Sequence, residues 1–286
     1  MMKKAIVLPN IQKDPDLIWT ARVVDMLCEN QISVYVDKRY DGAFNLDVEY
    51  YEEYPTDSDF IVVIGGDGSV IDASRIALEL DVPLLGINLG KVGYLATVDP
   101  DKLDILSLLS VGEYKVDERM LLSAEKIASD GSITVSERLA VNDVVICHDS
   151  YLGISDIRVD NDMGDQVQYR ADGVIISTPV GSTAYALSAG GPIISHRLES
   201  ISVTPICPHS FFNRSIVYSP DERIRVTNIG SSPLNISIDG RFFDTLAKDE
   251  TCIIGKANLA IKMISLGDQN IFWALSKKIK LLHELV

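Results

Sequence analysis

In the first third of the chain, short apolar runs alternate with segments of helical periodicity. The runs predict strands at Lys4–Leu8, Ile32–Val36, Ile61–Ile64 and Leu84–Ile87. Apolar residues three and four apart predict one helix over Leu17–Glu29 and another beginning at Ser69, which we expect to be its N-cap. This alternation is typical of βαβ units and predicts an α/β domain with a doubly wound, Rossmann-like parallel sheet.

Beyond Pro100 the apolar spacing changes to a period of two. One short helix is predicted at Lys102–Leu109. The following strands are predicted at Leu121–Ile127, Ile133–Leu139, Val141–Ile146, Ile154–Val159, Gly173–Ser177, Ser215–Tyr218, Arg223–Thr227, Leu234–Ile238, Thr251–Ile254 and Leu259–Ile264. So many short strands with few helices predict a β-rich, β-sandwich-like second domain. A helical stripe in the tail is expected to pack back on the first domain.

These patterns divide the chain into three parts. We expect an α/β domain over residues 1–99, a β-rich domain over 100–268 and a C-terminal helix over 269–286. The apolar part of the N-terminus stops at Pro9, so it is better interpreted as a first strand than as a signal peptide. We therefore expect a cytoplasmic protein.

Charge and cysteine content narrow the class of protein. The 286 residues include 41 acidic and 26 basic side chains, which gives a net charge of −15. This charge argues against nonspecific binding to nucleic acid or to an anionic membrane, because both need a basic face. The four cysteines and four histidines are scattered. Their spacing indicates no metal site, no disulfide framework and no Ser-His-Asp arrangement.

A glycine turn, Gly65-Gly66-Asp67-Gly68-Ser69, directly follows the strand at Ile61–Ile64. Glycines remove side chains where parallel strands end, so a ligand can approach the backbone. The helix that follows would present free N–H groups and a positive dipole end, which suits a phosphate. Asp67 is the one ionisable group in the turn, and beside a phosphate it would handle a proton or a metal ion. The alternative is a tight turn in which Asp67 caps a backbone N–H.

A second candidate site covers residues 170–192. Arg170 and Asp172 precede the strand Gly173–Ser177, and a loop rich in hydroxyls and glycines then leads into a short helix near Thr183. We interpret this loop as one that surrounds a ligand with backbone amides, hydroxyls and the ring of Tyr185. An ordinary polar loop is the alternative.

Asn142-Asp143 is a polar pair inside the apolar stretch from Leu139 to Ile146. Polar side chains in such a stretch need hydrogen-bond partners or an open cleft. A bulge or turn is the alternative to a binding role.

Together these elements resemble the NAD kinase family. The resemblance lies in the glycine turn, the Asn142-Asp143 pair and the run DGVIISTPVGSTAYALSAGGP at 172–192, with Gly86-Ile87-Asn88 and Gly93–Thr97 between them. The glycine turn alone is shared with diacylglycerol kinases, sphingoid-base kinases and phosphofructokinases. Its combination with the other two elements is specific. The resemblance extends from the first strand to about Asp239-Gly240, and the family's two-domain fold agrees with the pattern above.

The resemblance implies a role for each matching residue. Asp67 would be the catalytic proton acceptor for the adenosine-side ribose 2′-hydroxyl of NAD as it attacks the γ-phosphate of ATP. The phosphate turn would be shaped by Gly65, Gly66 and Gly68. The dinucleotide pocket would be formed by Tyr94, Asn142, Asp143, Arg170, Asp172, Thr183, Ala184, Tyr185 and Ser188. Asp143 stands where family members often have Glu, and Tyr94 where many have Phe. Two further departures could alter how phosphate or nicotinamide is held: Lys91 and Arg241.

The resemblance also implies the partners of the reaction. These are NAD as substrate, ATP or polyphosphate as donor, and Mg²⁺ or another divalent cation with ATP, in a homotetramer that shares pocket residues between subunits. Two alternatives stay open at this point. A lipid kinase would share the glycine turn, although the acidic balance and the lack of a basic or amphipathic membrane face count against it. A non-catalytic NAD(P)-binding sensor would bind the dinucleotide without forming NADP, and the presence of Asp67 counts against it.

Overall fold

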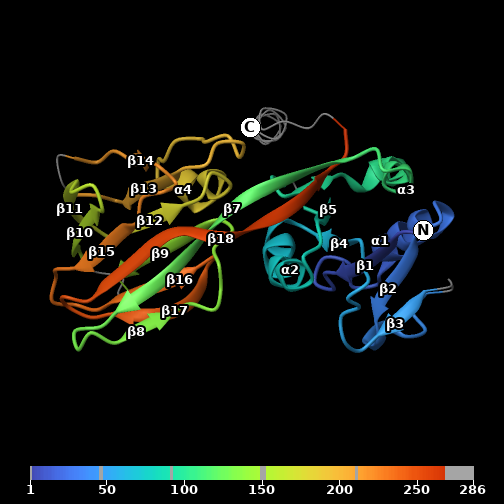
Figure 1. Cartoon of the computed structure of the whole chain (residues 1–286), viewed down its shortest axis with the longest axis horizontal. Coiled ribbons are helices and arrows are strands. Elements are labelled where there is room, and N and C mark those ends of the chain that lie inside the picture. Colours follow the sequence, from blue (N-terminus) through green and yellow to red (C-terminus); the bar gives the residue numbers. More distant parts are fainter. Residues whose placement is uncertain (1, 45–47, 91–92, 149–152, 210–211, 268–286) are drawn as a thin grey trace. The chain divides into compact units, whose positions relative to one another are not determined.

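The computed structural model describes residues 2–44, 48–90, 93–148, 153–209 and 212–267 (Figure 1). The chain forms two compact units. The first combines the chain up to Glu118 with the segment from Ile261 onward, and the second is Arg119–Ala260. The predicted C-terminal helix over 269–286 lies outside the described residues. Within the described residues, no helix has both the length and the apolar character needed to cross a membrane.

The first unit contains a parallel sheet in the order β5-β4-β1-β2-β3, which confirms the predicted α/β class (Figure 1). Its strands are β1 (Lys4–Pro9), β2 (Ser33–Asp37), β3 (Glu49–Tyr51), β4 (Phe60–Gly65), β5 (Leu84–Asn88) and the short β6 (Ala96–Val98), which pairs with β5. Its helical segments are α1 (Ile18–Glu29), η1 (Lys38–Tyr40), α2 (Asp67–Leu80), η2 (Pro100–Leu106) and α3 (Ser107–Val111).

The strand order places a topological switch point between β1 and β4. From β1 the chain continues through α1 to β2 on one side, and it later returns to β4 on the other side of β1 before α2 leads to β5. In open parallel sheets, ligands bind outside the carboxyl ends of the strands at such a point. The glycine turn follows β4 there, so the fold itself marks this turn as a candidate site.

Packing explains why these strands form. Every residue of β4 is buried, as expected for a central parallel strand. The core of the unit contains side chains from β1, β2, β4, β5 and α1. Ile264 and Leu266, which follow the second unit in the sequence, also belong to this core. The strands β3 and β6 were not predicted, because three residues each are too few to show a period.

The start of α2 corrects one expectation. Gly66, in extended conformation, is the N-cap and the helix begins at Asp67, so Ser69 lies in the first turn. The Ser69 hydroxyl accepts a hydrogen bond from the Asn10 side-chain amide at 2.7 Å. The Ser69 hydroxyl, which the local pattern predicts as the helix N-cap, is therefore bound instead by Asn10, a residue distant in sequence.

The second unit packs two antiparallel layers around one core, in agreement with the β-rich prediction. One layer has the order β14-β13-β12-β9-β16-β17, and the other contains β11-β10-β15-β18. The strands are β7 (Lys115–Ile127), β8 (Ile133–Val135), β9 (Asp143–His148), β10 (Ser155–Asn161), β11 (Gln166–Ala171), β12 (Gly173–Ser177), β13 (Ile201–Ile206), β14 (Ile216–Tyr218), β15 (Ile224–Asn228), β16 (Leu234–Ile238), β17 (Arg241–Leu246) and β18 (Thr251–Ser265). Inward-facing residues of both layers form a single apolar core.

Three strands of this unit were missed and one was divided. No strand was expected at β11, β13 or β17, and β13 is buried along its whole length, so it lacks the alternation of a half-buried strand. Where two strands were predicted at Thr251–Ile254 and Leu259–Ile264, β18 runs unbroken. Its first residues pair with β15, and Met263 pairs with Leu84 of β5.

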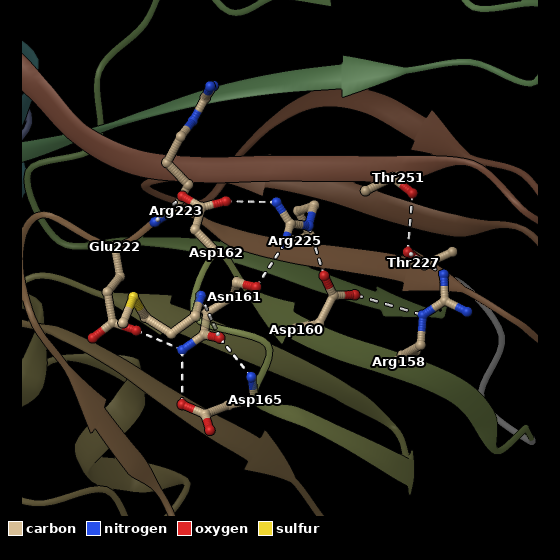
Figure 2. Close-up of polar contacts among 11 residues, drawn as sticks. Arg158, Asp160, Asn161, Asp162, Asp165, Glu222, Arg223, Arg225, Thr227 and Thr251 are labelled. Carbon is tan, nitrogen blue, oxygen red and sulfur yellow. Dashed lines mark hydrogen bonds and ion pairs between the residues drawn. The ribbon is translucent and has the colours of Figure 1, made fainter.

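A polar network ties the β10–β11 hairpin to β15 (Figure 2). Asn161, only 1 % exposed, donates to the Asp165 carboxylate at 3.0 Å and accepts from the Asp165 N–H at 2.8 Å. Arg225 bridges Asp160 and Asp162, each at 2.6 Å. Asp165 is thus bound within the hairpin, whereas Asp160 and Asp162 are bound by Arg225 of β15, so the network joins the hairpin to the neighbouring strand.

Candidate functional site

The glycine turn lies at the carboxyl end of β4, where close packing explains its first glycine. A Cβ atom at Gly65 would lie 2.2 Å from Ser69 Oγ and 2.7 Å from Ser69 Cβ. One at Gly66 would lie 2.4 Å from Lys13 Nζ, the end of a long side chain that can move aside, and one at Gly68 would meet nothing within 4 Å. Packing therefore requires glycine at position 65, and it leaves open space beside Gly68 for a ligand.

Asp67 is bound to a segment 27–29 residues further along the chain. Its Oδ2 accepts from the Tyr94 N–H at 2.9 Å, and its Oδ1 accepts from the N–H groups of Leu95 at 2.9 Å and Ala96 at 3.0 Å. A capping role inside its own turn was the alternative interpretation. The observed contacts instead join the first residue of α2 to the segment that enters β6.

This arrangement leaves one of the two Asp67 oxygens with room for a further donor. A carboxylate has about four lone-pair positions, and three are used here, two of them on Oδ1. Oδ2 therefore retains a position that a ligand hydroxyl can occupy. The same contacts fix the side chain, so the carboxylate is oriented before any ligand arrives. Tyr94, predicted as a pocket residue, is half-buried next to it, and burial followed by the Asp67 charge raises the pKa of its phenol.

Two residues after β1 complete this end of the sheet, and the sequence analysis missed both. Asn10 donates its backbone N–H to Ile64 O at 2.8 Å as well as its side-chain amide to Ser69. Lys13 places its ammonium against Gly66, and a Cβ at Gly90 would lie 3.4 Å from that ammonium. Both follow the strand next to β4 in the sheet, which is the signal that could have identified them.

A hollow of about 320 Å³ lies beside this turn, and its lining includes Lys13, Asn88 and Gly90. Asn88 is buried, and its Oδ1 accepts from the Gly90 N–H at 2.9 Å. The hollow also contains the carboxylates of Asp99 and Asp101, so its lining carries charges of both signs. Lys13 connects it to the turn, because the same ammonium lies against Gly66.

In the second unit, Asn142 and Asp143 lie at the start of β9, where two other residues hold their backbone. Asp239 Oδ2 accepts from the Val141 N–H at 2.8 Å, and its Oδ1 accepts from the N–H groups of Asn142 at 2.8 Å and Asp143 at 3.1 Å. Thr178 donates its hydroxyl to Val141 O at 2.6 Å and its N–H to Asn142 O at 2.9 Å. The pair is therefore held by side chains from two neighbouring loops, and the expected alternative of a simple bulge does not describe it.

Asp239 is a functional candidate that the sequence analysis missed. It begins the two-residue turn between β16 and β17, and both Asp239 and Gly240 have positive φ, +48° and +73°. A hairpin turn of this kind favours Asp-Gly. The Asp-Gly dipeptide between two alternating strands was thus a turn signal that the sequence shows. The hydrogen-bond partners of the Asp239 side chain lie 96–98 residues earlier, and no local pattern indicates them.

Burial and charge act together on the Asp143 carboxyl. It is 5 % exposed, and desolvation followed by the nearby Asp239 charge raises its pKa to about 7. Burial also raises the pKa of Asp239, while the three backbone N–H bonds oppose that rise. Asp143 and Asp239 therefore disfavour each other's ionised form, as two neighbouring carboxyl groups do.

The loop after β12 uses its hydroxyls differently from the expectation. Ser182 donates to Pro179 O at 2.6 Å and Thr183 donates to Val180 O at 3.0 Å, and both side chains are buried with Thr178. These hydroxyls build the loop rather than line its surface. The short helices η3 (Gly181–Thr183) and α4 (Tyr185–Ser188) follow, and they leave Tyr185 and Ser188 exposed and Ala184 half-buried.

Tyr185 stands beside several titratable groups of this unit. Burial is the main cause that raises the pKa of its phenol, and the charges of Cys147, Cys207, Asp172 and Asp143 add to it. Asp172, between β11 and β12, is half-buried with its carboxylate 3.6 Å from His148 Nε2. Arg170 is exposed on β11, in the other layer, and Arg241 is exposed at the start of β17. Lys91 lies outside the described residues.

The residues that the structure describes contain no group of three or more side chains placed to hold a metal ion. The carboxylate oxygens of Asp67 and Asp239 are largely used by backbone N–H groups.

Two family profiles cover most of the chain. The profile of the ATP-NAD kinase N-terminal domain matches residues 6–114, and that of the ATP-NAD kinase C-terminal domain matches residues 141–266. The first matched segment contains the glycine turn and Tyr94. The second contains the Asn142-Asp143 pair, the loop after β12 and Asp239.

Proteins with similar sequences and folds lead to the same family. The chain is 38% identical over 286 residues to the NAD kinase of Thermoanaerobacter sp. (strain X514), covering 97% of this chain and 99% of that one. It is 35% identical over 282 residues to the NAD kinase of Caldanaerobacter subterraneus subsp. tengcongensis, with 97% and 99% covered. Its fold resembles yeast NADH kinase complexed with NADH (TM-score 0.83, 20% identity, 96% and 86% covered) and an Archaeoglobus fulgidus NAD kinase in complex with ATP (TM-score 0.72, 24% identity, 96% and 99% covered). The chain therefore belongs to the NAD kinase family.

Proposed function

We propose that this enzyme transfers the γ-phosphate of ATP to the 2′-hydroxyl of the adenosine ribose of NAD and so produces NADP. Family membership supports the reaction. The observation that carries the residue assignment is the Asp67 carboxylate, which three backbone N–H groups fix in place at the switch point of the sheet while a lone-pair position on Oδ2 stays available.

The triphosphate binds at the glycine turn. The N-terminal N–H groups of α2 and the ammonium of Lys13 supply positive charge on the β1–β4 edge, and the open space at Gly68 admits a phosphate close to the backbone. Phosphoryl transfer passes through a loose transition state, so positioning and charge neutralisation do most of the catalytic work. Mg²⁺ enters with ATP as part of this substrate and neutralises the charge of its phosphates.

Asp67 accepts a hydrogen bond from the ribose 2′-hydroxyl at Oδ2. As the oxygen attacks phosphorus, the hydroxyl proton passes to this carboxylate, and the bond between the γ-phosphorus and the bridging oxygen of ADP breaks. The three backbone N–H groups hold the carboxylate at a constant angle during this step. Gly65, Gly66 and Gly68 shape the turn, and Tyr94 lines the adenine side.

The dinucleotide is bound by residues of the second unit. At the start of β9, the side chains of Asn142 and Asp143 form hydrogen bonds with NAD. The exposed Tyr185 provides a flat apolar ring against which the dinucleotide can pack. We assign the remaining pocket positions to Arg170, Asp172, Thr183, Ala184 and Ser188. Thr183 contributes through its backbone, because its hydroxyl is bonded to Val180.

Three further properties complete the proposal. The enzyme works as a homotetramer in the cytoplasm, with ATP or polyphosphate as the phosphate donor. The family resemblance supports the tetramer and the two donors. Sedimentation would measure the oligomeric state, and an assay with polyphosphate in place of ATP would test the donor.

The test is an assay in which newly formed NADP is detected by an NADP-specific dehydrogenase. NAD, NADH and diacylglycerol are compared as acceptors, and ATP and polyphosphate as donors. Formation of NADP from NAD and ATP supports the proposal. ATP consumption with diacylglycerol alone would identify a lipid kinase, and tight NAD binding without NADP would identify a sensor. Either result would overturn the proposed function.

A further inference from the structure

Asp239 and Thr178 together satisfy every backbone hydrogen-bonding group of residues 141–143. The three N–H groups donate to the Asp239 carboxylate, at 2.8, 2.8 and 3.1 Å. The carbonyls of Val141 and Asn142 accept from Thr178, and the carbonyl of Asp143 accepts from the Asp239 N–H at 3.0 Å. Two residues outside β9 therefore determine where this segment lies.

The loop that contains Thr178 leaves this segment no room to move toward it. A Cβ atom on Gly181 would lie 2.0 Å from the Asn142 carbonyl oxygen. Thr178 Oγ1 also accepts the Gly181 N–H at 3.0 Å, so the loop and the segment are bound as one piece. Any displacement of the Asn142 backbone must therefore be away from Thr178, and Asp239 is the group that opposes it.

The hairpin turn does not by itself explain why the carboxylate at this position points inward, to the backbone of residues 141–143. Asp249 has a similar left-handed conformation, with φ +64°, and its side chain is exposed. Asp239 is instead half-buried beside a second carboxyl group, the buried Asp143, which is an unfavourable arrangement of like charges. The compensating contacts are its bonds to the N–H groups of 141–143, and the positive charge of Arg138 adds a smaller effect.

We propose that Asp239 is a positioning residue for dinucleotide binding: its carboxylate fixes the backbone of 141–143 and so orients the Asn142 and Asp143 side chains toward NAD. The inference rests on the proposed function for the identity of the ligand. The backbone clamp itself is independent of that function, so the two can be tested separately.

The variant that tests this is Asp239→Asn. Asn-Gly suits the same hairpin turn as Asp-Gly, so the fold of the β16–β17 hairpin is retained. An amide has only one acceptor oxygen, so its NH₂ group must face at least one of the three backbone N–H donors. Two matched controls accompany it: Asp249→Asn removes an exposed carboxylate from a comparable turn, and Asn161→Ala breaks the buried network of Figure 2 and lowers stability away from the segment.

Two measurements are made on each full-length variant. Hydrogen–deuterium exchange monitors the amides of 141–143, and direct NAD binding together with the KM values for NAD and ATP monitors function. In Asp239→Asn we expect faster exchange at these amides and an increase of about tenfold in the Kd and KM for NAD, the factor that one lost hydrogen bond produces. The KM for ATP should stay unchanged, and neither control should show this pattern.

Unchanged exchange in Asp239→Asn would overturn the clamp, and faster exchange with unchanged NAD affinity would overturn the positioning role. An equal increase of both KM values, or the same increase in Asn161→Ala, would show a general loss of stability and would also overturn it. If the wild-type protein forms no NADP, the proposed function fails, while the exchange and NAD-binding measurements still decide the role of Asp239.

Discussion

Asp143 and Asp239 are joined by a reciprocal pair of backbone-directed hydrogen bonds. The Asp143 N–H donates to Asp239 Oδ1 at 3.1 Å, and the Asp239 N–H donates to Asp143 O at 3.0 Å. The buried Asp143 carboxyl group and the half-buried Asp239 carboxyl group are consequently held near each other, where each ionised form destabilises the other. The stability of the folded protein should therefore depend on pH through this pair.

Asp143→Asn should stabilise the protein more at pH 8 than at pH 4.5. The folded-state pKa of Asp143 is raised to about 7, against about 3.9 in an unfolded chain. A raised carboxyl pKa means that the folded state binds the proton more tightly, so wild-type stability falls as pH rises between these values. The charged group that acts on Asp143 is Asp239, and the phenol of Tyr185, whose pKa is raised, stays neutral over this range.

We expect the stability difference between Asp143→Asn and wild type to grow, on the order of 3 kcal/mol, from pH 4.5 to pH 8. Urea unfolding at both pH values measures it, and comparing the two differences cancels any constant effect of the new amide. Asp249→Asn is the control for loss of an exposed charge. A difference that is independent of pH would show that Asp143 titrates normally.

Asp67→Asn should lower turnover by about 10²–10⁴-fold, the usual effect of removing a general base. The amide cannot take the hydroxyl proton, and its NH₂ group cannot accept the N–H bonds that the carboxylate accepts. NAD affinity should be largely retained. Steady-state kinetics measure the turnover, and direct binding measures the NAD affinity. The control is Asp72→Asn, at an exposed position on the same helix. Lost NAD binding with unchanged turnover would refute the base assignment.

Gly68→Ala separates a ligand role from a folding role. The added methyl would meet nothing within 4 Å, and alanine in a helix is more stable than glycine, so unfolding should cost about 0.5–1 kcal/mol more. If a phosphate approaches the backbone here, the KM for ATP should nevertheless rise several-fold. Thermal unfolding and ATP kinetics on the same preparation test both statements. A more stable enzyme with an unaltered KM for ATP would show that no phosphate approaches Gly68.

Lys13→Gln should raise the KM for ATP about tenfold or more, because a hydrogen bond to a charged phosphate contributes about 1.5–3 kcal/mol. The KM for NAD should change little, and the KM for ATP should become less sensitive to added salt. Lys262→Gln, which removes an ammonium paired with Asp81 in the same unit, is the control. Equal effects of the two substitutions on ATP kinetics would count against a phosphate contact at Lys13.

The sequence pattern predicted the glycine turn and the fold class, because both depend on residues that are close to one another in the sequence. An unbroken β-branched run followed by Gly65 and Gly66 indicates a buried parallel strand and a bare turn, and the structure has both. Ser69 was assigned wrongly for the complementary reason. Its hydroxyl is bound by Asn10 across the sheet, and no local pattern contains that contact.

The residues that hold the candidate site in place could not be predicted, because their partners are distant in sequence. Asp67 binds Tyr94–Ala96, and Asp239 binds residues almost one hundred positions earlier. In both cases one carboxylate accepts three consecutive backbone N–H groups. The sequence pattern identified polar side chains such as Asp67, Asn142 and Asp143. The hydrogen bonds that hold these residues in place are visible only in the folded structure.

The course of β18 has a consequence for folding during synthesis. Arg119–Ala260 is one uninterrupted stretch, whereas the first unit needs Met263 beside β5 and Ile264 and Leu266 in its core. Domains usually fold in the order in which the ribosome makes them. Here the order of completion is reversed, because all residues of Arg119–Ala260 are made before Met263, Ile264 and Leu266 can join the first unit.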